Sequence, residues 1–172
     1  MATSHDEEFT AFAAASLPQL RRTAYLVCGD WHRAEDVVQD ALIRLYRVWR
    51  RVERQEALLA YARRTTIRLL VDESRRPWRR ERPTAGHGAD SWVSASSAGA
   101  VDERDVIVRA LSTLPPRRRA CVVLRYYHDL SVRETADVLG CSEGTVKSQT
   151  AHALATLRAV LGDLDLVKGT SS

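Results

Sequence analysis

The chain has few cysteines, and their positions do not fit a disulfide framework or a zinc site. Its 172 residues include three cysteines, Cys28, Cys121 and Cys141. They are odd in number, widely separated and without a Cys-x-x-Cys pair, which excludes the usual spacing of paired thiols and of zinc ligands. We therefore expect all three to be buried thiols that pack as small apolar groups.

Long apolar runs and the signs of an export signal are also missing. Hydrophobic residues make up 45% of the chain, which is enough for a packed core, but no run approaches the length of a transmembrane helix. The start, MATSHDEEFTAF, is acidic and lacks the basic and apolar regions of a signal peptide. These features predict a cytoplasmic protein that does not insert into a membrane.

The common sequence signs of catalysis are absent too. The 8 glycines form no Gly-rich loop that could cradle a phosphate, and the sequence contains neither a paired-histidine spacing nor a nucleophile elbow. We therefore predict that the protein is not an enzyme, that it needs no cofactor and that it has no metal site.

Lysine is scarce, so arginine supplies almost all of the positive charge. Lys147 and Lys168 are the only lysines, and the formal net charge is +4 at pH 7. The charge is unevenly distributed, because arginines concentrate between Arg44 and Arg82. Guanidinium groups fork onto phosphates and stack on bases, so such a stripe favours a polyanionic partner. A biased genome composition is the alternative, and it explains the clustering less well.

Three helical segments are predicted in the N-terminal half of the chain. Apolar residues recur at helical spacing over about Glu7–Cys28, Trp31–Val52 and Glu56–Arg76. Pro18 is expected to kink or divide the first segment. The second segment has a sustained apolar stripe, which the third is expected to cover while its own arginine-rich face stays exposed.

A stretch rich in Gly, Ser, Ala and Pro follows, and it has no helical period with which to bury surface. Beyond it, Asp102–Leu114 and Arg117–Tyr127 are predicted helices, separated by Pro115-Pro116. The fold class predicted is all-α, with two small helical domains joined by a flexible linker. The predicted parts are an N-terminal domain over 1–82, the linker over 83–101, a C-terminal domain over 102–161 and a short tail over 162–172.

A helix-turn-helix is predicted over residues 131–161. Ser131 and Glu134 fit a capping box, Gly140 fits a left-handed helix end, and Ser142 fits the N-cap of a second helix. An ordinary helical hairpin with a solvated polar face is the alternative. The outward side of the second helix could meet phosphates and base edges through Thr145, Lys147, Ser148, Gln149 and His152.

Two phrases in this order resemble a known family. AEDVVQDALIRLYRVW begins at Ala34, and LPPRRRACVVLRYYHDLSVRETADVLGCSEGTVKSQTAHALATLR begins at Leu114. Together they are similar to bacterial RNA polymerase sigma factors of the extracytoplasmic-function type (group IV), in an actinobacterial-like form. The resemblance covers almost the whole chain. It implies a domain that grips polymerase and melts promoters, followed by a helix-turn-helix domain, and a factor that directs promoter-specific initiation.

The resemblance also implies roles for particular residues of the N-terminal domain. The second helix would face a coiled coil in the clamp region of the largest polymerase subunit, although its charges could also merely solvate the helix and pair as Asp40 with Arg44. Many relatives carry asparagine where this chain has Arg68. The residues implied for polymerase are Asp36, Gln39, Asp40, Arg44 and Arg47, and those for the −10 element are Tyr61, Arg63, Arg64, Thr65, Arg68 and Arg75.

For the C-terminal domain the resemblance implies contacts with the −35 element and with the flap of the second-largest subunit. Gln149 could recognise adenine with two hydrogen bonds. Many relatives have arginine at the positions of Gln149 and His152, so the recognition helix is less basic here. Arg117, Arg118 and Arg119 are plausible phosphate clamps, and the helix itself would contribute Thr145, Lys147, Ser148, Gln149, Ala151 and His152.

Promoter DNA and core polymerase are therefore the expected partners, and an anti-sigma protein is a further possible one. Two other classes remain open from the residues themselves. One is a conventional helix-turn-helix regulator whose N-terminal helices serve dimerisation or sensing. The other is a purely helical interaction module without a nucleic-acid role, which would show little dependence of binding on salt.

Overall fold

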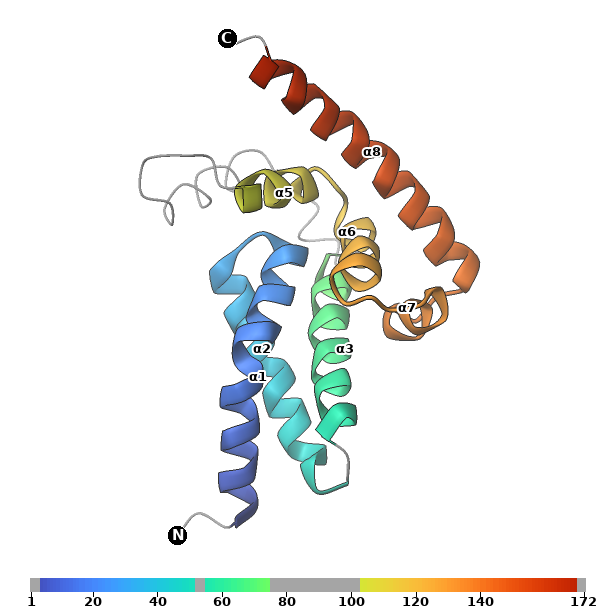
Figure 1. The fold of residues 1–172 in the computed structure, drawn as a ribbon. Helices are drawn as coiled ribbons and strands as arrows, with labels where there is room; N and C mark the ends of the chain where they lie inside the picture. Colours follow the sequence, from blue (N-terminus) through green and yellow to red (C-terminus); the bar gives the residue numbers. More distant parts are fainter. Residues whose placement is uncertain (1–3, 52–54, 75–102, 170–172) are drawn as a thin grey trace. The chain divides into compact units, whose positions relative to one another are not determined.

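A computed structural model describes residues 4–51, 55–74 and 103–169 (Figure 1). Every regular element within these ranges is a helix, which confirms the all-α prediction. The chain divides into two compact units, residues 1–80 and 81–172, and each is described by itself. The predicted linker over 83–101 lies outside the described residues.

The N-terminal unit is a bundle of three helices, α1 (Ser4–Cys28), α2 (Trp31–Val48) and α3 (Gln55–Glu73). The helices α1 and α2 run in opposite directions and α3 lies beside them, with each helix in contact with the other two (Figure 1). Their apolar stripes meet in one core, whose largest fully buried side chains include Leu20, Val38, Leu45, Ile67 and Leu70.

The boundaries of these helices differ from the prediction in two places. Pro18 lies inside α1, which neither divides nor stops there. The second helix ends at Val48 and continues as a 3₁₀ turn, Trp49–Arg51, rather than as α-helix to Val52.

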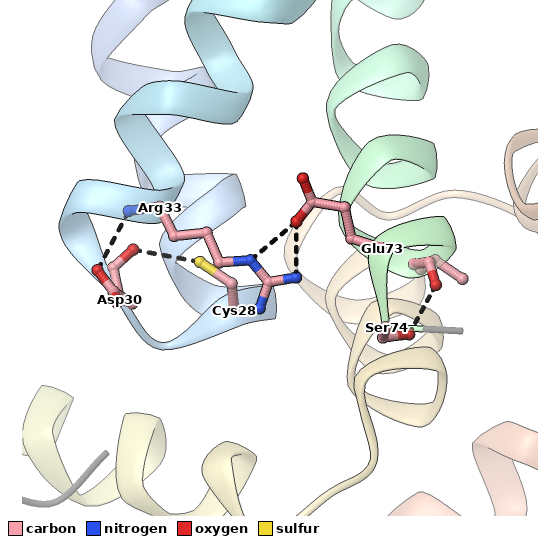
Figure 2. Close-up of polar contacts among 6 residues, drawn as sticks. Cys28, Asp30, Arg33, Glu73 and Ser74 are labelled. Atoms are coloured by element: carbon pink, nitrogen blue, oxygen red, sulfur yellow. Dashed lines mark hydrogen bonds and ion pairs between the residues drawn. The ribbon is translucent and has the colours of Figure 1, made fainter. Parts of the chain in front are cut away.

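The corner between α1 and α2 is fixed by local hydrogen bonds and an ion pair. Gly29 takes a positive φ of 75°, and the carboxylate of Asp30 caps α2 by accepting from the backbone N–H of Arg33 at 3.1 Å. The Arg33 side chain then reaches α3, where its Nε and Nη2 donate to Oε2 of Glu73 at 3.2 and 3.0 Å (Figure 2). Cys28 donates its thiol hydrogen to the carbonyl of Asp30. The start of α2 is therefore tied to the end of α3.

The C-terminal unit contains α5 (Glu103–Ser112), α6 (Pro116–Val122), α7 (Val132–Leu139) and α8 (Glu143–Gly169). The predicted helix up to Tyr127 changes at Val123 into a π-helical turn, Val123–Tyr127. The core collects the buried residues Ala110, Leu111, Leu114, Ala120, Cys121, Val123, Leu124, Ala136, Val146 and Ala153.

The predicted helix-turn-helix is confirmed in its local chemistry. Ser131 Oγ accepts from the N–H of Glu134 at 3.1 Å, and Oε2 of Glu134 accepts from the N–H of Ser131 at 2.7 Å, so the capping box is complete. Gly140 is left-handed, with φ 61° and ψ 47°. Ser142 Oγ then accepts from the N–H of Thr145 at 3.1 Å and caps α8.

The end of the chain and the cysteines of both units differ from what was expected. The second helix of the helix-turn-helix extends beyond Leu161 into the predicted tail, because α8 continues to Gly169. The three cysteines are not all buried: Cys121 is buried, whereas Cys28 and Cys141 are partly exposed. Within the described ranges, no helix is long and apolar enough to cross a membrane.

Candidate nucleic-acid interface

A hollow of about 300 Å³ lies between α2 and α3. It brings together four of the residues predicted to contact a −10 element, Tyr61, Arg64, Thr65 and Arg68. Helical spacing explains the grouping, because residues three and four apart share one face of α3. The opposite face carries Ala62, Thr66, Ile67 and Leu70, which are buried in the core. Arg63 is partly buried and does not line the hollow, and Arg75 lies outside the described residues.

The hollow also contains residues that the sequence reasoning assigned elsewhere or missed. Arg44 of α2 lines it, although it was predicted to face polymerase. Leu69 and Asp72 line it as well and were not predicted; the spacing of Asp72, four residues after Arg68, was the available signal. Three guanidinium groups, one phenol ring and one carboxylate around a single hollow suit an anionic ligand that also offers a flat, polar ring.

The exposed surface of α2 next to the hollow presents the remaining residues predicted for polymerase, because Asp40 and Arg47 lie one helical turn before and after Arg44. Asp36, Gln39, Asp40 and Arg47 are all exposed. In this part of the chain no ion pair joins Asp40 to Arg44, so the intrahelical pair considered as an alternative is not formed. The four side chains are therefore available as a mixed-charge surface.

An apolar groove continues this surface between α1 and α2. Phe9, Gln39, Leu42, Ile43 and Tyr46 line it, with a volume of about 480 Å³. Ile43 is 53% exposed and Tyr46 50% exposed, which is high for apolar groups of this size. The sequence reasoning missed both residues, because they fall outside the apolar stripe that it followed along α2.

Aromatic contacts connect the two sides of the groove. The ring of Phe9 lies edge-on to Tyr46 and Trp49, with centroids 4.9 and 5.2 Å apart. The Tyr46 hydroxyl donates to Oδ1 of Asp6 at 2.7 Å, and this hydrogen bond raises the pKa of the phenol. The tyrosine is thereby fixed on α1 while its ring stays half exposed.

The second helix of the helix-turn-helix, α8, presents a polar face, as predicted. Lys147, Ser148 and His152 are exposed, and Thr145 and Gln149 are partly buried. Nδ1 of His152 lies 2.8 Å from the carbonyl oxygen of Ser148. A carbonyl only accepts, so Nδ1 carries the hydrogen and Nε2 of the neutral ring is an acceptor.

The three arginines of α6 differ in environment, and the expectation of three phosphate clamps is wrong for Arg119. Arg117 and Arg118 are partly exposed, but Arg119 is only 8% exposed. Its Nη2 donates to the carbonyl oxygens of Ser112 and Leu114, each at 3.0 Å. Arg119 therefore closes the turn between α5 and α6, and its guanidinium is not available to a phosphate.

The described residues also bear on metal binding and on thiol reactivity. No group of three or more His, Cys, Asp or Glu side chains in the described ranges could hold a metal ion. Cys121 is buried, which raises the pKa of its thiol to about 11, with Cys141 adding to the rise. Such a thiol is protonated at neutral pH and is a packing group rather than a nucleophile.

Comparisons with known proteins match both units. Residues 12–80 match the family described as Sigma-70 region 2, and residues 104–157 match Sigma-70, region 4. The RNA polymerase sigma-E factor of Streptomyces coelicolor is 35% identical over 159 residues, covering 92% of this chain and 89% of the relative. The ECF RNA polymerase sigma factor SigM of Mycobacterium tuberculosis is 33% identical, covering 86% and 74%.

A solved structure shares the fold. It is the sigma factor RpoE from Bartonella quintana in a co-crystal with the anti-sigma factor NepR. The TM-score is 0.67 at 24% identity, and the match covers 91% of this chain and 98% of the solved one.

Proposed function

The chain belongs to the bacterial sigma factors of the extracytoplasmic-function type, and from this we propose how its surfaces divide the work of the family. The protein is an RNA polymerase sigma factor, which binds core polymerase and promoter DNA and directs promoter-specific initiation of transcription. Sigma factors are generally non-enzymatic DNA-binding regulators. We propose that this one has no covalent chemistry of its own and acts in the cytoplasm.

The proposed polymerase surface is the exposed side of α2 together with the adjoining groove. Asp36, Gln39, Asp40 and Arg47 give it a mixed charge pattern that suits specific docking on the clamp region of the largest subunit. Ile43 and Tyr46 add the exposed apolar area that the core of a protein interface requires. The charges would fix the register, and the groove would supply most of the affinity.

The proposed −10 site is the hollow between α2 and α3. Its guanidinium groups, Arg44, Arg64 and Arg68, can neutralise the DNA backbone. Tyr61 offers a ring on which an unstacked base can lie, and stacking of this kind is worth about 1–3 kcal/mol per base. The gathering of these groups around one hollow is the observation that carries the proposal. It also moves Arg44 from the polymerase set to the DNA set.

The proposed −35 contacts lie on the polar face of α8, helped by Arg117. We propose domain limits of 1–82 for the polymerase and −10 surfaces and 102–161 for the −35 surface, with a linker over 83–101. We also propose that the C-terminal domain contacts the flap of the second-largest subunit. An anti-sigma protein is a further proposed partner, as in the solved complex of similar fold.

A charge reversal at Asp40 tests the polymerase surface. Asp40→Arg places a cation in the middle of the exposed side of α2, and we expect it to abolish co-purification with core polymerase while the helical content stays unchanged. Glu7→Arg is the matched control, because Glu7 is an exposed acid on α1 and the change of charge is the same. Equal recovery of polymerase with Asp40→Arg and wild type would remove α2 from the interface.

A further inference from the structure

Arg118 and Gln149 form a pair that joins α6 to the recognition helix. Nε of Arg118 donates to Oε1 of Gln149 at 3.3 Å, although the two residues are 31 positions apart. Both side chains are partly exposed, so the pair lies at the margin of the polar face of α8. Thr145, Gln149 and His152 share this side of the helix, because they are spaced four and three residues apart.

The chemistry of the pair fixes the orientation of the amide. Arginine has only donors, so the glutamine atom that faces Arg118 must be the carbonyl oxygen. Half of the acceptor capacity of Gln149 is thereby used inside the protein and is held toward α6. The two N–H donors of the amide, by contrast, have no other partner in the described part of the chain.

The Arg118–Gln149 pair therefore presents mainly hydrogen-bond donors, unlike the free amide that the sequence suggested. A free glutamine recognises adenine because its oxygen accepts from N6 while its nitrogen donates to N7. In the pair, the oxygen is tethered and a guanidinium group adds further donors and a positive charge. An amino group on a base edge is itself a donor and would find few acceptors on this pair. A base edge that carries only acceptors would form hydrogen bonds with the donors of the pair.

We propose that Arg118 is a positioning residue that sets the base preference of Gln149 at the −35 element, turning it from adenine to guanine. Guanine presents two acceptors, N7 and O6, and no donor in this part of the major groove. The inference rests on the proposed function of α8 and goes beyond it, because it names the base and the residue that selects it. Arg118 acts through Gln149 rather than as a phosphate clamp.

Selection from a promoter library with a randomised −35 region tests the proposal. Holoenzyme would be assembled from core polymerase and the full-length chain, and Gln149→Ala would identify the one position whose preference depends on this side chain. At that position we expect wild type to favour guanine over adenine by about fivefold or more. Arg118→Leu should move the preference to adenine, because the amide is then free.

Arg117→Leu is the matched control, since it removes the same charge from the neighbouring residue of α6. It should weaken binding similarly at every sequence and leave guanine preferred. Gln149→Glu is a second variant: its carboxylate would still pair with Arg118 but only accept, so the preference should move to cytosine, whose N4 donates.

The outcomes separate this inference from the proposed function. Adenine preferred by wild type, or guanine still preferred by Arg118→Leu, would overturn the role of Arg118 while the −35 site stands. A wild-type holoenzyme that selects no −35 sequence at all would overturn both.

Discussion

Arginines do different work in the two units of this sigma factor. In the N-terminal unit, Arg44, Arg64 and Arg68 line an open hollow between two helices. In the C-terminal unit, Arg119 is buried against two carbonyl groups and Arg118 holds a glutamine. Arg125 likewise donates to the carbonyl of Leu130. The number of arginines therefore exceeds the number available to phosphates, because some of them are used inside the protein: Arg119 closes a turn, and Arg33 pairs with Glu73.

The largest effect is expected where an arginine is part of the fold. Arg119→Met should lower the free energy of unfolding of the C-terminal unit by roughly 2–4 kcal/mol, because two buried carbonyl groups lose a charged donor. Arg109→Met, an exposed arginine of α5, should change it by less than about 0.5 kcal/mol. Denaturant unfolding followed by circular dichroism measures both. If Arg119→Met keeps full stability but loses DNA affinity, the contrast between the two units fails.

An intermediate effect is expected where an arginine faces the hollow. Arg64→Ala should leave stability within about 0.5 kcal/mol but should reduce promoter affinity, and the slope of log K against log salt should become shallower by about 0.7–0.9. Arg22→Ala removes the same charge from an exposed site on α1 and should change neither quantity. Titration of holoenzyme with promoter DNA at several salt concentrations gives the slopes. Identical slopes for Arg64→Ala and wild type would exclude Arg64 from the backbone contacts.

An effect confined to high pH concerns the buried thiol of the C-terminal unit. Burial raises the pKa of Cys121 from its ordinary value of 9.0 to about 11, so the folded state holds its proton after the unfolded state has lost it. The contribution of the protonated Cys121 thiol to the free energy of unfolding is complete below about pH 9 and is lost as the pH rises from about 9 to about 11. The Cys121→Ala variant should not lose this part of the free energy of unfolding at high pH. Unfolding free energies of both proteins at pH 7 and near pH 10 measure the difference, and parallel pH curves would contradict the assignment.

The sequence predicted the helix caps and helix ends that depend on interactions between neighbouring residues. The capping box at Ser131, the left-handed Gly140 and the N-cap Ser142 each depend on residues within one helical turn, and all three are confirmed. The family is recognisable because two longer sequence motifs, one beginning at Ala34 and one at Leu114, occur in the same order as in the family. Other helix ends were less predictable: α1 passes through Pro18 and α8 continues to Gly169.

Features that depend on packing between distant residues could not be predicted. Arg117, Arg118 and Arg119 look alike in the sequence, and only the position of the α5–α6 turn shows that Arg119 is buried. Arg44 was placed with its neighbours on α2 because the contribution of α3 to the hollow is a tertiary contact. The partner of Gln149 is 31 residues away, so no local pattern points to it.

The central claim is that one unit has two adjoining surfaces with different roles, the exposed side of α2 for polymerase and the α2–α3 hollow for the −10 element. Permanganate footprinting of −10 thymines in promoter complexes tests this most directly, because it reports strand opening. With core polymerase, wild type should make the thymines reactive, Asp40→Arg should recruit no polymerase, and an Arg44→Ala/Arg64→Ala variant should recruit polymerase but leave the thymines protected. Thymines as reactive with the double variant as with wild type would contradict the account.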